Sequence, residues 1–251
     1  MTSNTLLIEG GRVYDHQGNT DIPSIADVFI RNGYIERVGP RAMPGAEPPS
    51  DPNRVINARD RLLIPGLVNA HYHSHDVLLK GSYETIPFYM WLLNALPPQY
   101  PKRSVEEVRA RTLLGAAECL HNGITTVQDM LTISPFDEEH LDVVLDAYDC
   151  IGVRAVFSLQ VGDTPGIERV PFWRETVPER FYSYLGAAVA VGGPSPAEMV
   201  REQYLRRVDA GRRLTWALSP TSAILSSRDL LEEVAALSSE YSLPVTTHLY
   251  E

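Results

Sequence analysis

The stretch at residues 65–73 constrains the fold of this chain more than any other part of the sequence. An apolar run that begins at Leu62 leads directly into two histidines, His71 and His73. Continuous apolar sequence is typical of a strand buried on both sides, as in a parallel α/β barrel, where functional residues follow the carboxyl ends of strands. Residues two apart on a strand project from the same face, so both imidazoles can reach one metal ion. Taken alone, such a pair is more often explained by packing.

The sequence changes character at about residue 65. Residues 1–64 contain short strand segments joined by tight turns, and Asn32-Gly33 is a strong signal for a type I′ hairpin. From residue 65 onward, strand segments alternate with helical segments, which is typical of a parallel α/β sheet. We therefore expect a small β-domain over residues 1–64 and an α/β domain over residues 65–251. Its later strands are expected near residues 124–127, 153–158, 214–219 and 244–251.

Composition argues against several classes of partner. The formal net charge is −10, and no cluster of Lys and Arg is present of the kind that nucleic acids or anionic membranes require. No uncharged apolar run approaches the about 18 residues of a membrane span, and the N-terminus has no signal-peptide pattern. Cys119 and Cys150 lack a metal-binding or redox spacing, which favours buried thiols in a reducing compartment. We therefore expect a cytoplasmic protein with no nucleic-acid or membrane partner.

The order Pro-Gly, apolar pair, Asn and His-x-His at residues 65–73 resembles the first-strand signature of the amidohydrolase superfamily. Gly-Ile-Thr-Thr-Val at residues 123–127 is similar to its second-strand sequence. Members are metal-dependent hydrolases on a TIM-type (β/α)8 barrel beside a small β-sandwich. The resemblance implies this α/β fold class here, with residues 1–64 as part of the sandwich and residues 65–251 as about five of the eight barrel units.

The resemblance also implies that part of the active site lies outside this sequence. In the superfamily, a further histidine follows strand six and a metal-binding aspartate follows strand eight. Because only about five units are expected here, both residues would be missing. We therefore expect the N-terminal part of a larger hydrolase, with the C-terminal half on the same or a separate polypeptide.

A third histidine, His248, ends the expected fifth strand as His71 and His73 end the first. Alone, it has an ordinary explanation as a core or loop residue. Together, three imidazoles at matching strand ends would leave the open position that a catalytic Zn or Fe site needs. The spacing from His248 to Glu251 resembles the His-x-x-Glu of deaminases and chlorohydrolases in the superfamily. The resemblance implies that Glu251 is the general acid and base; a frayed terminal carboxylate is the competing interpretation.

The scarcity of lysine favours a site with one metal ion. Only Lys80 and Lys102 occur, and neither lies near the expected fourth strand at residues 214–219. Superfamily branches with two metal ions bridge them through a carbamylated lysine at that strand. The sequence therefore favours one divalent ion, Zn²⁺ or alternatively Fe²⁺, because imidazole suits both. It also favours the branch of cytosine and guanine deaminases and triazine hydrolases.

In that branch, the metal activates a water molecule that attacks an sp2 carbon bearing an amino or chloro group. We therefore expect an amidohydrolase of the cyclic-amidine deaminase type, which acts on a small nitrogen heterocycle and forms a homo-oligomer. Dechlorination of a triazine-like ring is an alternative with similar chemistry. A non-catalytic or assembly subunit that keeps the fold is a further alternative, although retention of both histidine motifs argues against it.

Four residues are candidate substrate contacts. Phe88 and Trp91 lie in an irregular stretch expected over the catalytic end, where their rings could line a pocket for a flat heterocycle or simply pack the loop. Gln160 begins a second stretch of this kind. His75 continues the histidine alternation beyond the expected strand end, so a substrate-loop or surface role is expected.

Other polar residues near these motifs are given structural roles. His121 is expected at a helix C-terminus, where an imidazolium suits the helix dipole. His140 is expected at the surface. Asp129 follows the expected second strand and is interpreted as a loop cap rather than as a residue that faces the site.

Overall fold

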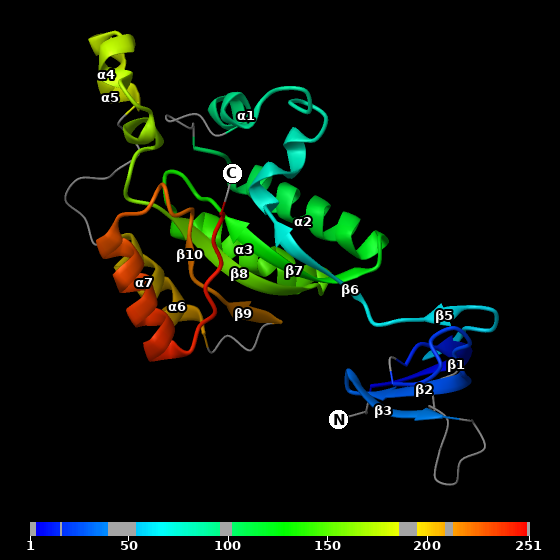
Figure 1. Cartoon of the computed structure of the whole chain (residues 1–251). Helices are drawn as coiled ribbons and strands as arrows, with labels where there is room; N and C mark the ends of the chain where they lie inside the picture. Colours follow the sequence, from blue (N-terminus) through cyan, green and yellow to red (C-terminus); the bar gives the residue numbers. More distant parts are fainter. Residues whose placement is uncertain are drawn as a thin grey trace. The chain divides into compact units, whose positions relative to one another are not determined.

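The computed structural model describes residues 4–15, 17–39, 54–95, 102–185, 195–208 and 213–249. The chain divides into two compact units, Met1–Gly66 and Leu67–Glu251, whose elements are labelled in Figure 1. The second unit carries the histidines discussed above. Each unit is described by itself below.

The first unit is a five-stranded sheet in the order β3-β2-β1-β4, with β5 also paired to β1. Its strands are β1 (Thr5–Val13), β2 (Ile25–Arg31), β3 (Tyr34–Gly39), β4 (Val55–Asn57) and β5 (Leu62–Leu63). Both Asn32 and Gly33 have positive φ, as the expected hairpin between β2 and β3 requires. The described strands form one sheet, so a second sandwich layer is not among them.

The second unit is a parallel sheet in the order β10-β8-β7-β6, with β9 also paired to β8. Its strands are β6 (Leu67–Tyr72), β7 (Ile124–Leu131), β8 (Arg154–Val161), β9 (Leu214–Trp216) and β10 (Ser219–Pro220). The expected fifth strand is present as two isolated parallel bridges, Leu218 to Val245 and Ser222 to His248. Parallel pairing places the carboxyl ends of β6, β7 and β8 at one edge. Among the described strands the sheet is open, not a closed barrel.

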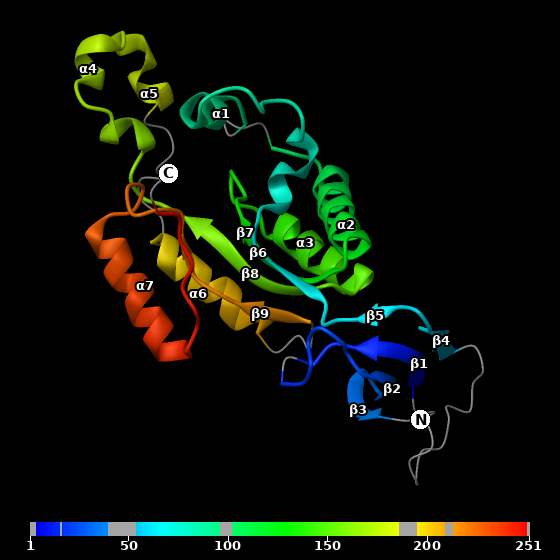
Figure 2. The same cartoon turned by 45° about the vertical axis from the view of Figure 1, so that its right-hand side comes forward.

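Helices cover this sheet, as Figures 1 and 2 show, with α2 packed on β7, α6 on β8 and α7 on β10. The longer helices are α1 (Phe88–Ala95), α2 (Val105–His121), α3 (Glu138–Ile151), α6 (Pro196–Arg207) and α7 (Arg228–Tyr241). The short ones are η2 (Ser74–Leu79), η3 (Gly166–Arg169), α4 (Trp173–Thr176), η4 (Glu179–Phe181) and α5 (Tyr182–Leu185). None of the helices in the described residues has the length and apolarity needed to cross a bilayer.

Local signals explain where the longer helices begin and end. Ser104 caps α2 by accepting from the Glu107 backbone N–H, and Asp137 caps α3 in the same manner. The left-handed Gly152 ends α3. Ser195 forms a capping box at α6, and Ser227 caps α7. Sequence-local hydrogen bonds therefore define the helix ends that frame the sheet.

The hydrophobic core of the second unit lies between the sheet and its helices. Its largest fully buried side chains include Phe157 of β8 and Tyr148 of α3. By contrast, Leu67 and Val68 of β6 are 50% and 66% exposed. The expectation that this apolar run forms one strand buried on both sides is wrong. Leu62 belongs to the sheet of the first unit, and β6 is an edge strand of the second.

Gly115 provides the close approach of α2 to β6. A Cβ atom at this position would overlap the Tyr72 hydroxyl and lie 2.7 Å from Val77 Cγ2. We expect Gly115→Ala to lower the free energy of unfolding by about 1–3 kcal/mol, because overpacking outweighs the better helix propensity of alanine. Urea unfolding followed by tryptophan fluorescence measures this change.

The double variant Tyr72→Phe/Gly115→Ala supplies the control. Removal of the hydroxyl should recover part of the loss, so the two changes should not be additive. A Gly115→Ala protein as stable as the wild type would contradict the close approach.

Candidate functional site

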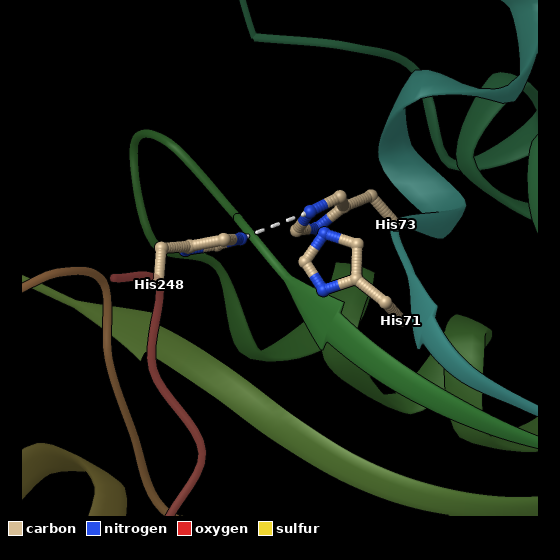
Figure 3. Close-up of side chains that lie close together, drawn as sticks. All are labelled: His71, His73 and His248. Carbon is tan, nitrogen blue, oxygen red and sulfur yellow. Dashed lines mark hydrogen bonds between the residues drawn. The ribbon is translucent and has the colours of Figure 1, made fainter. Parts of the chain in front are cut away.

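The three histidines at the strand ends lie together, as Figure 3 shows. His71 lies in β6, His73 directly follows it, and His248 lies at the bridge to Ser222. Each imidazole offers one nitrogen, and these nitrogens all lie within 4.8 Å of one another. The ring centroids are 4.9 to 5.2 Å apart. The fold thus brings together His73 and His248, which are 175 positions apart in the sequence.

Backbone carbonyls determine how two of these rings present their nitrogens. His73 Nδ1 lies 2.8 Å from the Met130 carbonyl oxygen, and His248 Nδ1 lies 2.6 Å from the Thr221 carbonyl oxygen. A carbonyl oxygen only accepts hydrogen bonds, so these two contacts assign a proton to each Nδ1. In the neutral ring, each Nε2 then has a lone pair, and the two Nε2 atoms lie 3.3 Å apart. Two facing lone pairs repel, so a cation between them would stabilise this arrangement.

The separation of the two Nε2 atoms fits a shared divalent ion. Nitrogens bound to one tetrahedral ion at about 2.0–2.1 Å lie about 3.4 Å apart. The observed separation between His73 and His248 is 3.3 Å. His71 completes a set of imidazole donors, and imidazole is a preferred ligand of zinc and iron. The residues present therefore fit a divalent metal ion.

A protein-family model matches the part of the sequence that contains the three clustered histidines. The sequence model of the Amidohydrolase family matches residues 62–251, which is most of the chain and includes the three clustered histidines. The chain belongs to the amidohydrolase family. The resemblance of residues 65–73 to the superfamily signature is thereby confirmed.

The relatives of this chain include two deaminases. The chain is 28% identical over 225 residues to the 5′-deoxyadenosine deaminase of Methanococcus vannielii, covering 90% of this chain and 46% of the relative. It is 29% identical over 247 residues to the 5-methylthioadenosine/S-adenosylhomocysteine deaminase of Pyrococcus furiosus, covering 98% and 50%. The chain thus spans about half the length of the curated relatives it matches.

Solved structures share the fold of this chain. Atrazine chlorohydrolase from Arthrobacter aurescens TC1, complexed with zinc, superposes with a TM-score of 0.73 and 21% identity. Guanine deaminase from C. acetobutylicum, with bound guanine, superposes with a TM-score of 0.72 and 18% identity. Each match covers 98% of this chain and 53% of the other. The chain therefore shares the fold of the matched parts of these two proteins.

Asp129 is a fully buried carboxylate on β7, the strand paired with the histidine strand β6. It lies within β7, in register with Tyr72 of β6. Its carboxylate accepts hydrogen bonds from the Ser74 backbone N–H, the Ser74 hydroxyl and the Tyr148 hydroxyl. Burial raises the pKa of Asp129, and these hydrogen bonds oppose that change. Its interpretation as a loop cap after the strand is wrong, because the residue is part of the strand.

His75 is also buried, with 5% of its surface exposed, so the expected surface role is wrong. Its Nδ1 accepts from the Thr132 backbone N–H at 3.2 Å, and its Nε2 lies 3.2 Å from Asp76 Oδ1. Its carbonyl oxygen accepts from Arg103 and Arg111. Burial lowers the pKa of His75, which favours the neutral ring. Both ring nitrogens thus serve the packing of η2; contact with substrate stays a prediction.

The other predicted substrate contacts have different surroundings. Gln160 of β8 donates to the Met130 carbonyl oxygen and accepts from the Thr132 hydroxyl, at 3.3 and 3.1 Å. Its amide therefore lies behind His73, on the same carbonyl that His73 uses. Trp91 is half-buried in α1, which lies on the side of the sheet where β6 and β7 end (Figures 1 and 2).

Two predicted site residues are less fully described. Phe88 begins α1, but its side chain is outside the described part of the structure, and Glu251 is outside the described residues altogether.

Two residues that were expected to have structural roles can be placed. His121 ends α2, as expected, whereas His140 is buried in α3, so its expected surface position is wrong.

Residues 74, 129 and 148 form the part of the site that sequence reasoning missed. One signal was present: β7 reads ITTVQDML, with an aspartate among apolar residues. A carboxylate in a buried strand needs hydrogen-bond donors from elsewhere in the chain. That signal indicates a buried network, although it does not identify the donors.

Proposed function

We propose that the protein containing this chain is a metal-dependent hydrolytic deaminase, which replaces an exocyclic amino group on a nitrogen heterocycle by oxygen and releases ammonia. The observation that supports this most strongly is the 3.3 Å separation of His73 Nε2 and His248 Nε2, each presented by a carbonyl on its own Nδ1. The relatives named as deaminases support the reaction class.

His71, His73 and His248 would hold one divalent ion, Zn²⁺ in preference to Fe²⁺ because a similar structure is described as complexed with zinc. When bound, such an ion supplies Lewis acidity, which makes water nucleophilic near neutral pH. The Met130 and Thr221 carbonyls keep two of the imidazoles in the tautomer that binds through Nε2. Neutral ligands of this kind leave the positive charge of the ion available to polarise the water.

Glu251 is proposed to move the proton. Its carboxylate would accept one proton from the attacking water and deliver it to the ring nitrogen, and would then pass the second water proton to the leaving amine, as a general base and general acid. Water thus supplies the oxygen of the product; one of its protons leaves with ammonia, and the other stays on the ring nitrogen of the keto product. The spacing of Glu251 from His248, three residues along the chain, supports this role.

The proposed substrates are adenine nucleosides modified at the 5′ position, because the relatives are named for 5′-deoxyadenosine, methylthioadenosine and S-adenosylhomocysteine. The chain aligns with about half of each relative. The remaining length, on the same or a separate polypeptide, would complete the site and extend the sheet beyond the exposed β6 edge.

Ammonia release from a panel of compounds tests the proposal. The complete protein, loaded with Zn²⁺, is assayed with adenosine, its three 5′-modified derivatives, guanine, cytosine, a pterin and a chlorotriazine. Release of ammonia from an adenine nucleoside supports the proposal. Release of chloride alone would favour dechlorination. Metal-loaded protein that releases neither product would favour a non-catalytic subunit.

We expect Glu251→Gln to lower kcat by about 10²- to 10⁴-fold, the range that positioned proton transfer contributes. Bound zinc per chain should stay unchanged, because Glu251 is not among the proposed ligands. Steady-state kinetics with metal analysis measure both quantities. Glu240→Gln, a change to an exposed carboxylate in α7, is the control. The same kcat in Glu251→Gln and Glu240→Gln would contradict a proton-transfer role for Glu251.

A further inference from the structure

We propose that Asp129 is a positioning residue, which sets the orientation of His73 by holding the residue that follows it. This inference rests on the proposed metal site for its functional meaning. The contacts that support it belong to this chain alone.

The carboxylate of Asp129 holds the turn that leads out of the histidine strand. Asp129 Oδ1 accepts from the Ser74 backbone N–H at 3.0 Å, and Oδ2 accepts from the Ser74 hydroxyl at 2.7 Å. Ser74 is the first residue of η2, whereas His73 still has extended backbone dihedrals, φ −131° and ψ 101°. The chain therefore changes direction between His73 and Ser74, where Asp129 binds it.

The next residue of β7 holds His73 itself. The Met130 carbonyl oxygen accepts from His73 Nδ1 at 2.8 Å. Consecutive residues of β7 thus bind consecutive residues of the neighbouring segment: Met130 binds the ring of His73, and Asp129 binds the backbone and side chain of Ser74. Rotation about His73 ψ would move the Ser74 N–H, and rotation about χ1 would move the ring. Together, these hydrogen bonds hold the backbone and the ring of His73 in one orientation.

A third donor connects Asp129 to the core. The Tyr148 hydroxyl of α3 donates to Asp129 Oδ2 at 2.7 Å, and the Tyr148 side chain is fully buried. A buried carboxylate without donors would be strongly destabilising. Here it has three donors, and bonds to a charged acceptor are about twice as strong as neutral ones. Asp129 therefore links Tyr148 in the core to Ser74, the residue that follows His73.

The chain offers a matched control. Asp163 also accepts from the backbone N–H and hydroxyl of one serine, Ser227, at the beginning of α7. No histidine adjoins Ser227 in the sequence. Asp163→Asn therefore removes the same kind of charged acceptor without acting on a histidine.

The experiment compares Asp129→Asn, Ser74→Ala and Asp163→Asn in the complete protein labelled with ¹⁵N-histidine. The His73 signals are assigned with His73→Asn, and long-range ¹⁵N–¹H spectra of the metal-free proteins at pH 8 report the ring tautomer. Titration with Co²⁺, followed by visible absorption, reports metal affinity. Urea unfolding reports stability. Ser74→Ala is the milder variant. If Asp129→Asn does not fold, Ser74→Ala still tests whether the hydrogen bonds between Asp129 and Ser74 orient His73.

We expect Asp129→Asn to give a mixture of His73 tautomers and to weaken Co²⁺ binding by about 10- to 100-fold, as loss of an outer-shell partner does. Ser74→Ala should change the His73 tautomer ratio and the Co²⁺ affinity in the same direction as Asp129→Asn, but by smaller amounts. Asp163→Asn should lower the urea midpoint but leave tautomer and affinity as in the wild type. A wild-type tautomer and affinity in Asp129→Asn, with reduced stability alone, would overturn the proposal. If the wild type itself binds no Co²⁺, the proposed function fails, and the tautomer comparison still tests Asp129.

Discussion

His73→Ala should abolish tight metal binding and, with it, catalysis. The variant removes one of two nitrogens that face each other at 3.3 Å and leaves His248 with no imidazole opposite it. Loss of an outer partner of a ligand already costs about 10- to 100-fold in affinity, so loss of the ligand should cost more than about 100-fold. Titration with Co²⁺ and the zinc content of the purified protein measure this, and His248→Ala should behave alike.

His121→Ala is the matched control for this prediction. His121 is an exposed histidine at the end of α2, outside the histidine cluster. Its removal should leave metal affinity as in the wild type. Zinc at 100 times its Kd should stabilise the wild type and His121→Ala by about 2.7 kcal/mol, but should not stabilise His73→Ala. Tight zinc binding by His73→Ala would show that the ligand set is wrong.

The sequence was sufficient for features that depend on neighbours along the chain. The helix ends at Ser104, Asp137 and Gly152 follow from capping residues and a left-handed glycine. The meeting of His71, His73 and His248 followed from their shared position at strand ends, because parallel strands end at one edge of a sheet. Both kinds of inference use only chain order and periodicity.

Features that depend on distant partners were not predictable in this manner. His75 was expected in a substrate loop or at the surface, but it is buried, and the Thr132 backbone N–H, 57 residues away, donates to its ring. Asp129 was interpreted as a cap, but its donors on Ser74 and Tyr148 lie 55 and 19 residues away. Which residues of β6 and β7 oppose each other depends on register, which is irregular between these strands. The sequence therefore identified the histidines that lie together but not the hydrogen-bond network around them.

The exposed face of β6 has a related cause. An apolar run predicts that a strand can be buried, but burial also requires elements that cover both of its sides. Among the described strands, β6 pairs only with β7 and lies at the sheet edge. Val68 is therefore 66% exposed although its neighbours in the sequence suggested a core position.

Phe157→Ala should cause the largest loss of stability that a single core change produces in this unit, about 3–5 kcal/mol. Phe157 is fully buried in β8, in register with Asp129 of β7 and Trp216 of β9. Its ring meets Trp216 edge-to-face with centroids 5.2 Å apart, which adds to the loss on truncation. Urea unfolding followed by tryptophan fluorescence measures it, because every tryptophan of the chain lies beyond residue 67 and reports on the second unit.

Val68→Ala is the contrasting variant. It also shortens an apolar strand residue, but on the exposed side of β6, so the change should stay within about 0.5 kcal/mol. Equal losses in the two variants would mean that the core is not between the sheet and its helices. Phe157→Ala, if folded, should weaken Co²⁺ binding less than Asp129→Asn does, because the bonds from Asp129 and Met130 to the His73 turn remain. The core thus stabilises the sheet, whereas two adjacent residues of β7 hold His73 and the turn that follows it.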